Sequence, residues 1–323
     1  MTDRAWGFEA VGVDGVRQLR FVQVDVFTDR IFGGNPLAVF LDGEDLTTDR
    51  MQAIALEMNL SETVFLLPTS RTDCDLRVRI FTPSQELPFA GHPTLGTAWV
   101  VVEHGVHLPQ HGTLVLEEGI GPVRVTFRDD VLWMEQRPAD LKPPLEDLAT
   151  VAAMLGLDEA DLHPAAPPRV GSTGNRFLLV ALRDREAVDR VQLDKRALEE
   201  RLGGPPAIGV MVVTVDEGQV DLPLGGGETM AATSVYTRML PGRRTGGSED
   251  PATGSASGPL GAYLVAHGLA PAADVVGIVS RQGEAMGRPS DVYITVRPDD
   301  GAIEVGGQVV PVLTGTLSLP ADA

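Results

Sequence analysis

The chain consists mostly of short stretches in which apolar and polar residues alternate, a pattern typical of half-buried β-strands. Arg20 to Phe27 and Leu76 to Phe81 show this alternation clearly. Two stretches depart from it, because Leu95 to Val102 and Leu260 to Val265 are apolar on most sides at helical spacing. A helix that is apolar all round is buried all round. We therefore expect two central helices, each wrapped by strands.

The two apolar helices belong to a repeat. Residues 81–105 and 239–268 each begin with an apolar pair and a proline, pass through a loop rich in Gly and Pro, and end in His-Gly. Gly91 aligns with Gly254 (254 − 91 = 163), and Gly105 aligns with Gly268 (268 − 105 = 163), so no gap is needed. The pattern predicts a duplicated α+β fold.

Other segments repeat in the same order. The stretch 173–180 resembles 33–40, which places Asn35 on Asn175. Residues 216–233 have no counterpart in the first half, and their run of glycines suggests a mobile excursion. Helices are expected to end at Met58 and to cover Leu148–Leu155 and Asp194–Leu202. We expect an N-terminal arm (1–19), a first domain (20–138), a linker (139–168) and a second domain (169–319), related by a pseudo-twofold axis.

Composition narrows the possible partners. The 323 residues exceed the roughly 250 to 300 at which a single core stops growing, which favours two domains. A formal charge of −19 argues against nucleic acid or an anionic membrane, since both repel an acidic protein. Uninterrupted apolar runs such as Ala98 to Val102 are too short to span a membrane. A single cysteine, Cys74, excludes an internal disulfide and fits a reducing cytoplasm.

Motifs for a nucleotide or a metal are missing from the sequence. No GxGxxG opens a helix after a strand, and neither a Walker loop nor HExxH occurs. The histidines form no cluster with acids at ligand spacing. His104 and His267 precede Gly at the expected helix ends, where they suit capping. We expect neither a metal site nor a cofactor.

The starts of the two central helices are candidate binding sites. Pro93 suits the first turn of a helix, which places Gly91 and His92 at its entrance. Gly254 and Ser255 occupy the matching place in the second copy. Free N–H groups at a helix start attract anions, so two facing starts can bind a carboxylate. The alternative is that these residues, with Asp250 and Thr253, only cap helices and shape tight turns.

Glu62 is the candidate acid or base. It lies between Ser61 and Thr63 at the entry of an apolar strand, and burial there raises the pKa of a carboxyl toward neutrality. The alternative is an exposed glutamate, the commoner situation. His92 lies between Gly and Pro, which makes it an improbable core residue.

Five stretches together resemble the PhzF family of phenazine biosynthesis-like isomerases, which share the diaminopimelate epimerase fold. They are VDVFTDRIFGGNPLAVF, NLSETVFLLP, RIFTPSQELPFAGHPTLGTAW, STGNRFLLV and SEDPATGSASGPLGAYL, with QGEAMGRPS as a weaker match, in family order from Val24 to Ser290. The resemblance implies two domains, each a β barrel around a central helix, usually a homodimer, and cofactor-free proton transfer. The family prototype isomerises a dihydro-hydroxyanthranilate.

The resemblance also implies roles for individual residues. Glu62 is the proton-transferring acid/base, with His92 and Asp250 assisting it as catalytic residues. Binding of the substrate falls to Gly91, Gly254, Ser255 and Asn35. Epimerase relatives carry a cysteine at each helix entrance as a two-thiol pair, whereas this chain has Gly91 and Ser255 at the places that matter. One carboxylate acting alone implies a proton shift between carbons rather than inversion.

The sequence thus predicts a cytoplasmic, biosynthetic isomerase that moves a proton between carbons of a small carboxylated metabolite, cyclic, amino or hydroxy, in the cleft between its domains. One alternative is an epimerase or bond-cleaving enzyme that uses the same cleft. Another is a family member that binds small molecules without catalysis. Segments 216–233 and 242–248, beside the cleft, look longer and richer in glycine than the family pattern. The sequence therefore does not identify the substrate, and it does not show whether these segments form a lid.

Overall fold

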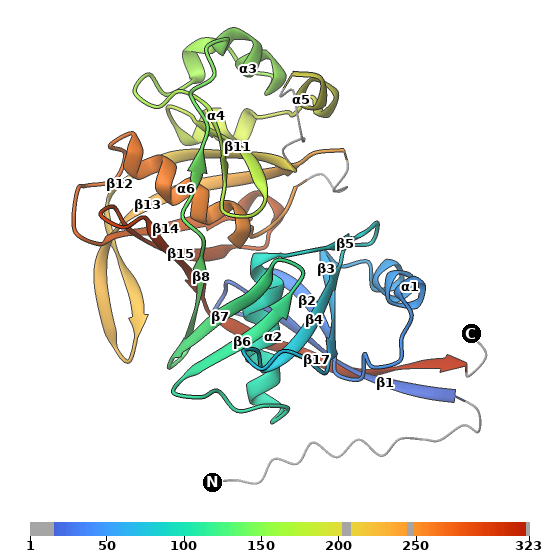
Figure 1. Ribbon diagram of the computed structural model, residues 1–323. Helices are drawn as coiled ribbons and strands as arrows, with labels where there is room; N and C mark the ends of the chain where they lie inside the picture. Colours follow the sequence, from blue (N-terminus) through green and yellow to red (C-terminus); the bar gives the residue numbers. More distant parts are fainter. Residues whose placement is uncertain (1–15, 202–207, 244–248, 321–323) are drawn as a thin grey trace.

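The computed structural model describes residues 16–201, 208–243 and 249–320. Most of the expected N-terminal arm and residues 244–248 of the glycine-rich segment fall outside these ranges, as does Leu202 at the end of one expected helix. The described chain forms two lobes, each with one long central helix, α2 in one and α6 in the other (Figure 1). It is an α+β fold with far more strand than helix.

The first lobe is a curled sheet around α2 (Gly91–Glu103). Hydrogen-bonded neighbours follow the order β17, β1, β2, β3, β4, β6, β7, β8. The bounds are β1 (Val16–Val26), β2 (Asn35–Phe40), β3 (Glu62–Leu67), β4 (Leu76–Phe81), β6 (Thr113–Glu118), β7 (Gly121–Arg128), β8 (Val131–Gln136) and β17 (Val309–Pro320). Short β5 (Glu86–Leu87) pairs with β4, and α1 (Thr48–Met58) connects the parallel pair β2 and β3.

The second lobe repeats this arrangement around α6 (Gly254–Ala266). Its neighbours follow the order β9, β10, β11, β12, β13, β14, β15, β16. The bounds are β9 (Asp140–Leu141), β10 (Arg169–Ser172), β11 (Arg176–Ala181), β12 (Gly209–Gly225), β13 (Glu228–Pro241), β14 (Val276–Gln282), β15 (Ser290–Arg297) and β16 (Ala302–Gly307). In both lobes the central helix connects a parallel pair, β4 with β6 and β13 with β14.

Two nearly continuous strands close both barrels. β8 pairs with β16 and runs on into β9, which pairs with β10 of the second lobe. β16 runs on into β17, which returns to the first lobe and pairs with β1 from Val16↔Pro320 to Val26↔Val309. Part of the expected second domain, residues 169–319, therefore belongs by its pairing to the first lobe.

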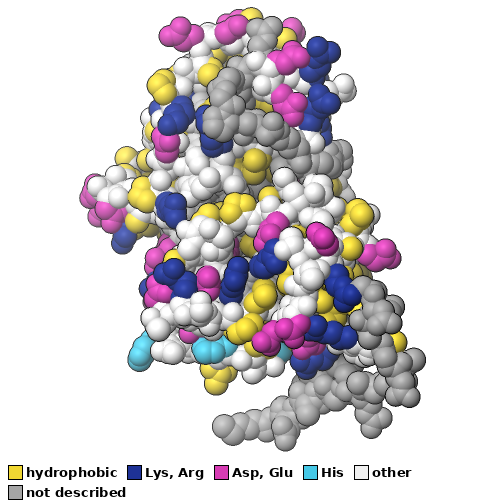
Figure 2. Space-filling model, turned by 45° about the vertical axis from the view of Figure 1, so that its right-hand side comes forward, with side chains coloured by type: hydrophobic (Ala, Val, Ile, Leu, Met, Phe, Trp, Pro, Cys, Tyr) yellow, Lys and Arg dark blue, Asp and Glu magenta, His cyan; other side chains and the backbone are white. Residues whose placement is uncertain are grey.

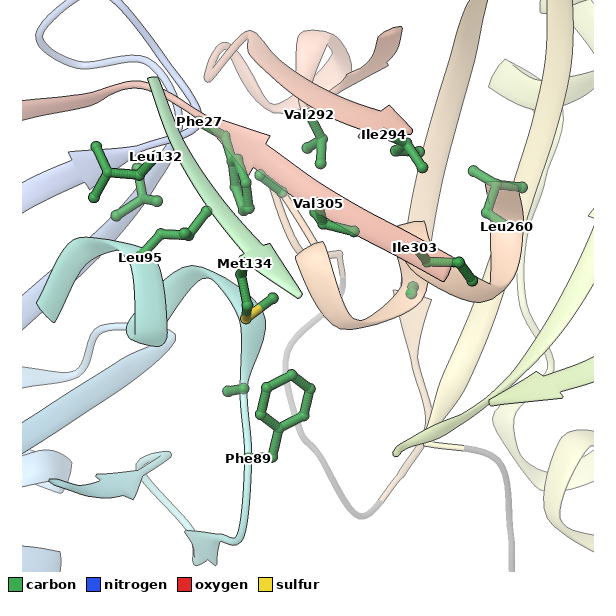
Figure 3. Packing of buried hydrophobic residues seen from close by; sticks show 14 of the residues in the cluster. Phe27, Phe89, Leu95, Leu132, Met134, Leu260, Val292, Ile294, Ile303 and Val305 are labelled. Atoms are coloured by element: carbon green, nitrogen blue, oxygen red, sulfur yellow. The ribbon is translucent and has the colours of Figure 1, made fainter. Parts of the chain in front are cut away.

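The core explains why the two helices are apolar on nearly every side. One cluster of buried residues extends from Leu95 of α2, through Met134 of β8 and Val305 of β16, to Leu260 of α6 (Figure 3). Leu95 and Leu260 are both 0% exposed. The expected 163-residue offset is confirmed at both ends, since α6 starts at 254 (254 − 91 = 163) and ends at 266 (266 − 103 = 163).

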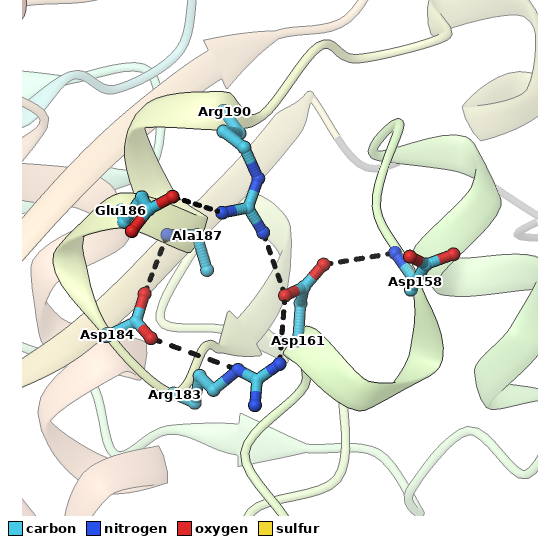
Figure 4. Close-up of polar contacts among 7 residues, drawn as sticks. All are labelled: Asp158, Asp161, Arg183, Asp184, Glu186, Ala187 and Arg190. Atoms are coloured by element: carbon cyan, nitrogen blue, oxygen red, sulfur yellow. Dashed lines mark hydrogen bonds and ion pairs between the residues drawn. The ribbon is translucent and has the colours of Figure 1, made fainter.

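A layer of short helices covers the outer face of the second barrel. It comprises α3 (Leu148–Met154), the turn η1 (Glu159–Asp161), α4 (Arg185–Arg190) and α5 (Lys195–Arg201). Arg183 and Arg190 both reach Asp161, whose side chain is 9% exposed, and these ion pairs join α4 to η1 (Figure 4). The short turn η2 (Glu284–Met286) follows β14.

The excursion expected at residues 216–233 is wrong as a description of that segment. These residues extend β12 and β13 into one long antiparallel hairpin with Gly225 to Gly227 at its tip. Leu222 and Ala232 are buried with Trp133 of β8, so apolar contacts fix the hairpin against the first lobe. β1 begins at Val16 rather than Arg20 and β17 runs on to Pro320. The short strands β5, β9 and β10 and the helix α4 were not foreseen.

Candidate active site

A cavity of about 380 Å³ lies where the two barrels meet. Its walls come from the turn between α1 and β3, the loop after β4, the start of α2, the residues just before β11 and β12, the C-terminal end of β13, and the loop and first turn of α6. The residues that line it are Asn59, Leu60, Ser61, Glu62, Thr82, Pro83, Ser84, Leu87, Ala90, Gly91, His92, Asn175, Ile208, Met239, Pro241, Glu249, Asp250, Thr253, Gly254 and Ser255. Every expected site residue except Asn35 lines this cavity.

The starts of α2 and α6 touch each other in the floor of this cavity. A side chain added at Gly91 would place its Cβ 2.7 Å from the Ser255 nitrogen, so only glycine allows the approach. Neither N-cap residue, Ala90 or Thr253, caps its helix with a side-chain hydrogen bond. Two sets of helix-start N–H groups therefore converge without side-chain caps, an arrangement that suits a carboxylate.

Glu62 opens β3 and points into the cavity near His92. Asn59, in the left-handed conformation at φ 51°, ends α1 and turns the chain into this strand. The Glu62 side chain is 15% exposed, and its Oε2 lies 3.3 Å from His92 Nε2. Burial, followed by the nearby charge of Asp250, raises the pKa of Glu62 well above the ordinary glutamate value. Of the two situations that the sequence leaves open for Glu62, buried and exposed, the structure shows a largely buried side chain.

His92 is a neutral partner for Glu62. It is 4% exposed, and burial lowers its pKa to about 3 despite a hydrogen bond to the backbone of Pro36. Proline has no N–H, so that bond runs from an imidazole N–H to the Pro36 carbonyl. Within the described residues Nε2 has no hydrogen-bond partner, so we assign the proton to Nδ1. The free lone pair of Nε2 then faces the Glu62 carboxyl.

Asp250 stands beside Glu62 on the second lobe. Its Oδ1 accepts from Asn35 Nδ2 at 2.9 Å, its Oδ2 accepts from the Thr253 hydroxyl, and Ser61 adds a further hydrogen bond. Burial raises the pKa of Asp250 to about 6, although these three bonds oppose the rise. A carboxyl with this pKa changes charge close to neutral pH.

Asn35 lies behind the cavity wall. It is 0% exposed and does not line the cavity, and its Nδ2 also donates to the Ala252 carbonyl at 2.9 Å. The position of Asn35 suits orientation of Asp250 rather than the contact with substrate expected from the sequence. Its repeat partner Asn175 does line the cavity, where its Nδ2 donates to the Phe89 carbonyl at 3.3 Å.

Gln282, the last residue of β14, supports the loop that carries Asp250. It is 0% exposed, its Nε2 donates to the Asp250 carbonyl at 2.7 Å, and its Oε1 accepts from the Thr253 N–H at 3.1 Å. No motif in the sequence indicates a role for Gln282, although this residue opens the QGEAMGRPS stretch. Its partners Asp250 and Thr253 lie about thirty positions earlier in the chain, so no local pattern points to it. The repeat that aligns Asn35 with Asn175 was the one sequence signal for further polar residues near the site.

The charges around the cavity are acidic. Among the described lining residues the ionisable side chains other than His92 are Glu62, Glu249 and Asp250, and none is Lys or Arg. Glu249 forms an ion pair with Arg238 at 2.8 Å. With no lysine or arginine among the described lining residues, the N–H groups at the helix starts are the donors available to a carboxylate, and Asp250 is an acceptor available to an amino group. Residues 216–233, expected beside the cleft, do not line this cavity.

Comparison with known proteins places this architecture in a family. Residues 24–315 match the model of the phenazine biosynthesis-like proteins. An uncharacterized isomerase of Mesorhizobium japonicum is 37% identical over 317 residues, covering 92% of this chain and 98% of that protein. A trans-2,3-dihydro-3-hydroxyanthranilate isomerase of Pseudomonas aeruginosa is 34% identical over 296 residues, covering 89% of this chain and 95% of that protein.

The fold agrees with the sequence matches. The crystal structure of a Bacillus anthracis phenazine biosynthesis protein of the PhzF family superposes with a TM-score of 0.80 at 25% identity, covering 93% of this chain and 99% of that one. The resemblance and the fold class expected from the sequence are thereby confirmed. The chain belongs to the PhzF family of phenazine biosynthesis-like proteins.

Proposed function

We propose that this protein is an isomerase that moves a proton between two carbons of a small amino- or hydroxy-carboxylate, with Glu62 as the only proton carrier. The observation that carries the proposal is the pair of Glu62 Oε2 and His92 Nε2, 3.3 Å apart and both largely buried at the cavity wall. A largely buried carboxyl with a raised pKa, next to a neutral imidazole, is suited to take up and release a proton.

The cavity provides a place for each group of such a substrate. The substrate carboxylate binds the N–H groups at the starts of α2 and α6, where Gly91 and Gly254 allow close approach. Asp250, held by Asn35 and Thr253, accepts a hydrogen bond from the amino or hydroxyl group. These contacts hold the reacting carbons beside Glu62.

The proton then moves in two steps. The Glu62 carboxylate removes a proton from one carbon, and the electron pair shifts along the adjacent double bond. The new Glu62 carboxylic acid donates a hydrogen bond to His92 Nε2, which stabilises the protonated form. Glu62 finally returns the proton to a second carbon on the same face. Gly91 and Ser255 stand where a two-thiol epimerase carries its cysteines, which supports a mechanism with one base.

The relatives support the substrate class. The P. aeruginosa relative is an isomerase of trans-2,3-dihydro-3-hydroxyanthranilate, a compound that carries an amino, a hydroxyl and a carboxylate group. We propose that the substrate of this chain is of the same class, a cyclic or short amino-hydroxy-carboxylate. The relatives named as isomerases favour catalysis over a family member that only binds such compounds.

The test is proton exchange in deuterated water with trans-2,3-dihydro-3-hydroxyanthranilate and related amino- and hydroxy-carboxylates, followed by NMR. Glu62→Gln removes the carrier and keeps the shape, so we expect exchange and turnover to fall by at least about 10³-fold. Glu57→Gln, on the exposed face of α1, is the matched control and keeps wild-type rates. Wild-type turnover in Glu62→Gln overturns the proposal, and inverted stereochemistry at a single carbon identifies an epimerase instead.

A further inference from the structure

A second buried carboxyl lies on the other side of α2 from Glu62. Glu118, the last residue of β6, is 5% exposed, and one of its oxygens, Oε1, lies 2.6 Å from the hydroxyl of Thr94. Thr94 is 0% exposed in the first turn of α2, and its hydroxyl lies 2.7 Å from the carbonyl of Ala90. Ala90 is the N-cap residue of α2 and lines the cavity.

These two contacts compete for one proton. The Thr94 hydroxyl has a single proton, and the Ala90 carbonyl can only accept a hydrogen bond. The hydroxyl can therefore donate to only one of the two oxygens, and while it donates to Ala90 the 2.6 Å contact is a hydrogen bond only if Glu118 donates its own proton to Thr94. In this arrangement Glu118 is a neutral carboxylic acid. Burial raises the pKa of Glu118 to about 8, with the contact to Thr94 as the smaller, opposing influence.

The second lobe has the same support without a titratable group. Ser257 (94 + 163 = 257) donates to the carbonyl of Thr253 (90 + 163 = 253) at 2.9 Å, as Thr94 donates to Ala90. There Gln282 ends β14 as Glu118 ends β6, and its Nε2 donates at 3.0 Å to the hydroxyl of Thr253, the counterpart of Ala90, rather than to Ser257. A glutamine keeps its hydrogen at any pH, whereas a glutamic acid loses it.

We propose that Glu118 is a positioning residue whose proton holds the first turn of α2, and that loss of this proton loosens the cavity wall formed by Gly91 and His92. An ionised Glu118 accepts the only proton of Thr94, so the Ala90 carbonyl loses its 2.7 Å bond and keeps the longer 3.3 Å bond from the Thr94 N–H. The N–H groups at the helix start, which follow Ala90 directly, then lose their fixed direction.

The surroundings of Glu118 permit this ionisation. It lines a hollow of about 490 Å³ on the outside of the first barrel. The charged side chains that share the hollow are Arg77 and Arg79 from β4, Glu86 from β5 and Glu117 from β6. Arg79 pairs with Glu86 at 2.7 Å, and Glu117 accepts from the Thr69 hydroxyl. From α2 the facing polar group is Thr94.

Hydrogen exchange of the full-length protein, corrected for the intrinsic rate at each pH, tests the proposal without any substrate. Between pH 7 and pH 9 we expect amide protection in the first turn of α2 to fall roughly tenfold in the wild type. Glu118→Gln keeps the donor and does not titrate, so its protection stays constant. Glu117→Gln, the neighbouring position on the same strand, behaves as the wild type. Equal loss in Glu118→Gln, or no loss in the wild type, overturns the proposal.

Two further measurements separate positioning from general stability. Thr94→Val removes the hydroxyl that connects Glu118 to the Ala90 carbonyl, so the amide hydrogens of the first turn exchange fast at both pH values. Thr94→Ser keeps the hydroxyl and restores protection. If Thr94→Val does not fold, Glu118→Gln and Glu117→Gln decide the question alone. An activity measurement rests on the proposed function: with trans-2,3-dihydro-3-hydroxyanthranilate, KM rises above pH 8 in the wild type but not in Glu118→Gln, while kcat is unchanged. Absence of turnover contradicts the proposed function and leaves the exchange result standing.

Discussion

At the scale of single residues, the candidate site depends on hydrogen bonds that come from far away in the sequence. Asn35 reaches Asp250 across 215 positions of the chain, and Gln282 reaches it across 32. Each amide fixes one part of the loop that carries the carboxyl. The sequence identified Glu62, His92 and Asp250 as candidates from motifs, but it gave no means to separate residues that touch a substrate from residues that stand behind them.

Asn35→Ala tests this distinction. It leaves Asp250 Oδ1 and the buried Ala252 carbonyl without the Asn35 donor, so we expect a loss of about 1 to 3 kcal/mol in the free energy of unfolding. It also removes a bond that lowers the pKa of Asp250, so that pKa rises further. Asn175→Ala is the control, because Asn175 donates one long bond of 3.3 Å. Urea unfolding and carboxyl NMR titration measure both effects, and equal losses in the two variants contradict the positioning role.

At the scale of elements, the two central helices were predicted well because their signal is local. An apolar surface on most sides and proline in the first turn of α2 follow from neighbouring residues, the repeat at a fixed offset supports them, and both helices start and end as expected. The long β12–β13 hairpin was missed because its apolar residues pack on Trp133, about ninety positions earlier in the chain. A glycine-rich segment looks like a loop until that packing surface is known.

Gly91→Ala tests the contact between the helix starts. The added methyl group meets backbone atoms of Gly254 and Ser255 at 2.7 to 2.9 Å, which cannot move away as a flexible side chain can. We expect a loss of about 1 to 3 kcal/mol in stability and a clear loss of affinity for small carboxylates. Gly174→Ala is the control, since its Cβ has its nearest neighbour at 3.5 Å. Thermal unfolding and calorimetric binding of anthranilate distinguish the two, and an unaffected Gly91→Ala contradicts the account.

At the scale of the whole molecule, the two lobes share their closing strands. β17 follows the second lobe in sequence but pairs with β1, next to the strands that surround α2 (Figure 1). No local pattern reveals this, because any two amphipathic strands can pair. Acidic and basic side chains are interspersed on the face shown in Figure 2. None of the helices in the described ranges is long and apolar enough to cross a membrane. The expected homodimer stays a prediction.

The shared strand makes a prediction about fragments. Residues 16–138 alone lack β17, so we expect them to show poor NMR dispersion and no cooperative unfolding. Fusing residues 306–320 through a short linker before Val16 supplies the missing strand, because Pro320 pairs with Val16. The fused fragment is expected to unfold cooperatively. Cooperative unfolding of residues 16–138 without this addition would show that β17 is dispensable for the first lobe.

The central claim is that one buried carboxyl carries one proton from carbon to carbon. It is tested most directly with trans-2,3-dihydro-3-hydroxyanthranilate deuterated at the carbon that loses its hydrogen, incubated with the protein in ordinary water. The Glu62 side chain is only 15% exposed, so the deuterium that it takes up exchanges slowly with water. Part of the deuterium should therefore appear at the new carbon of the product. Product that carries hydrogen from water alone, with the deuterium fully lost at the first turnover, would contradict the account.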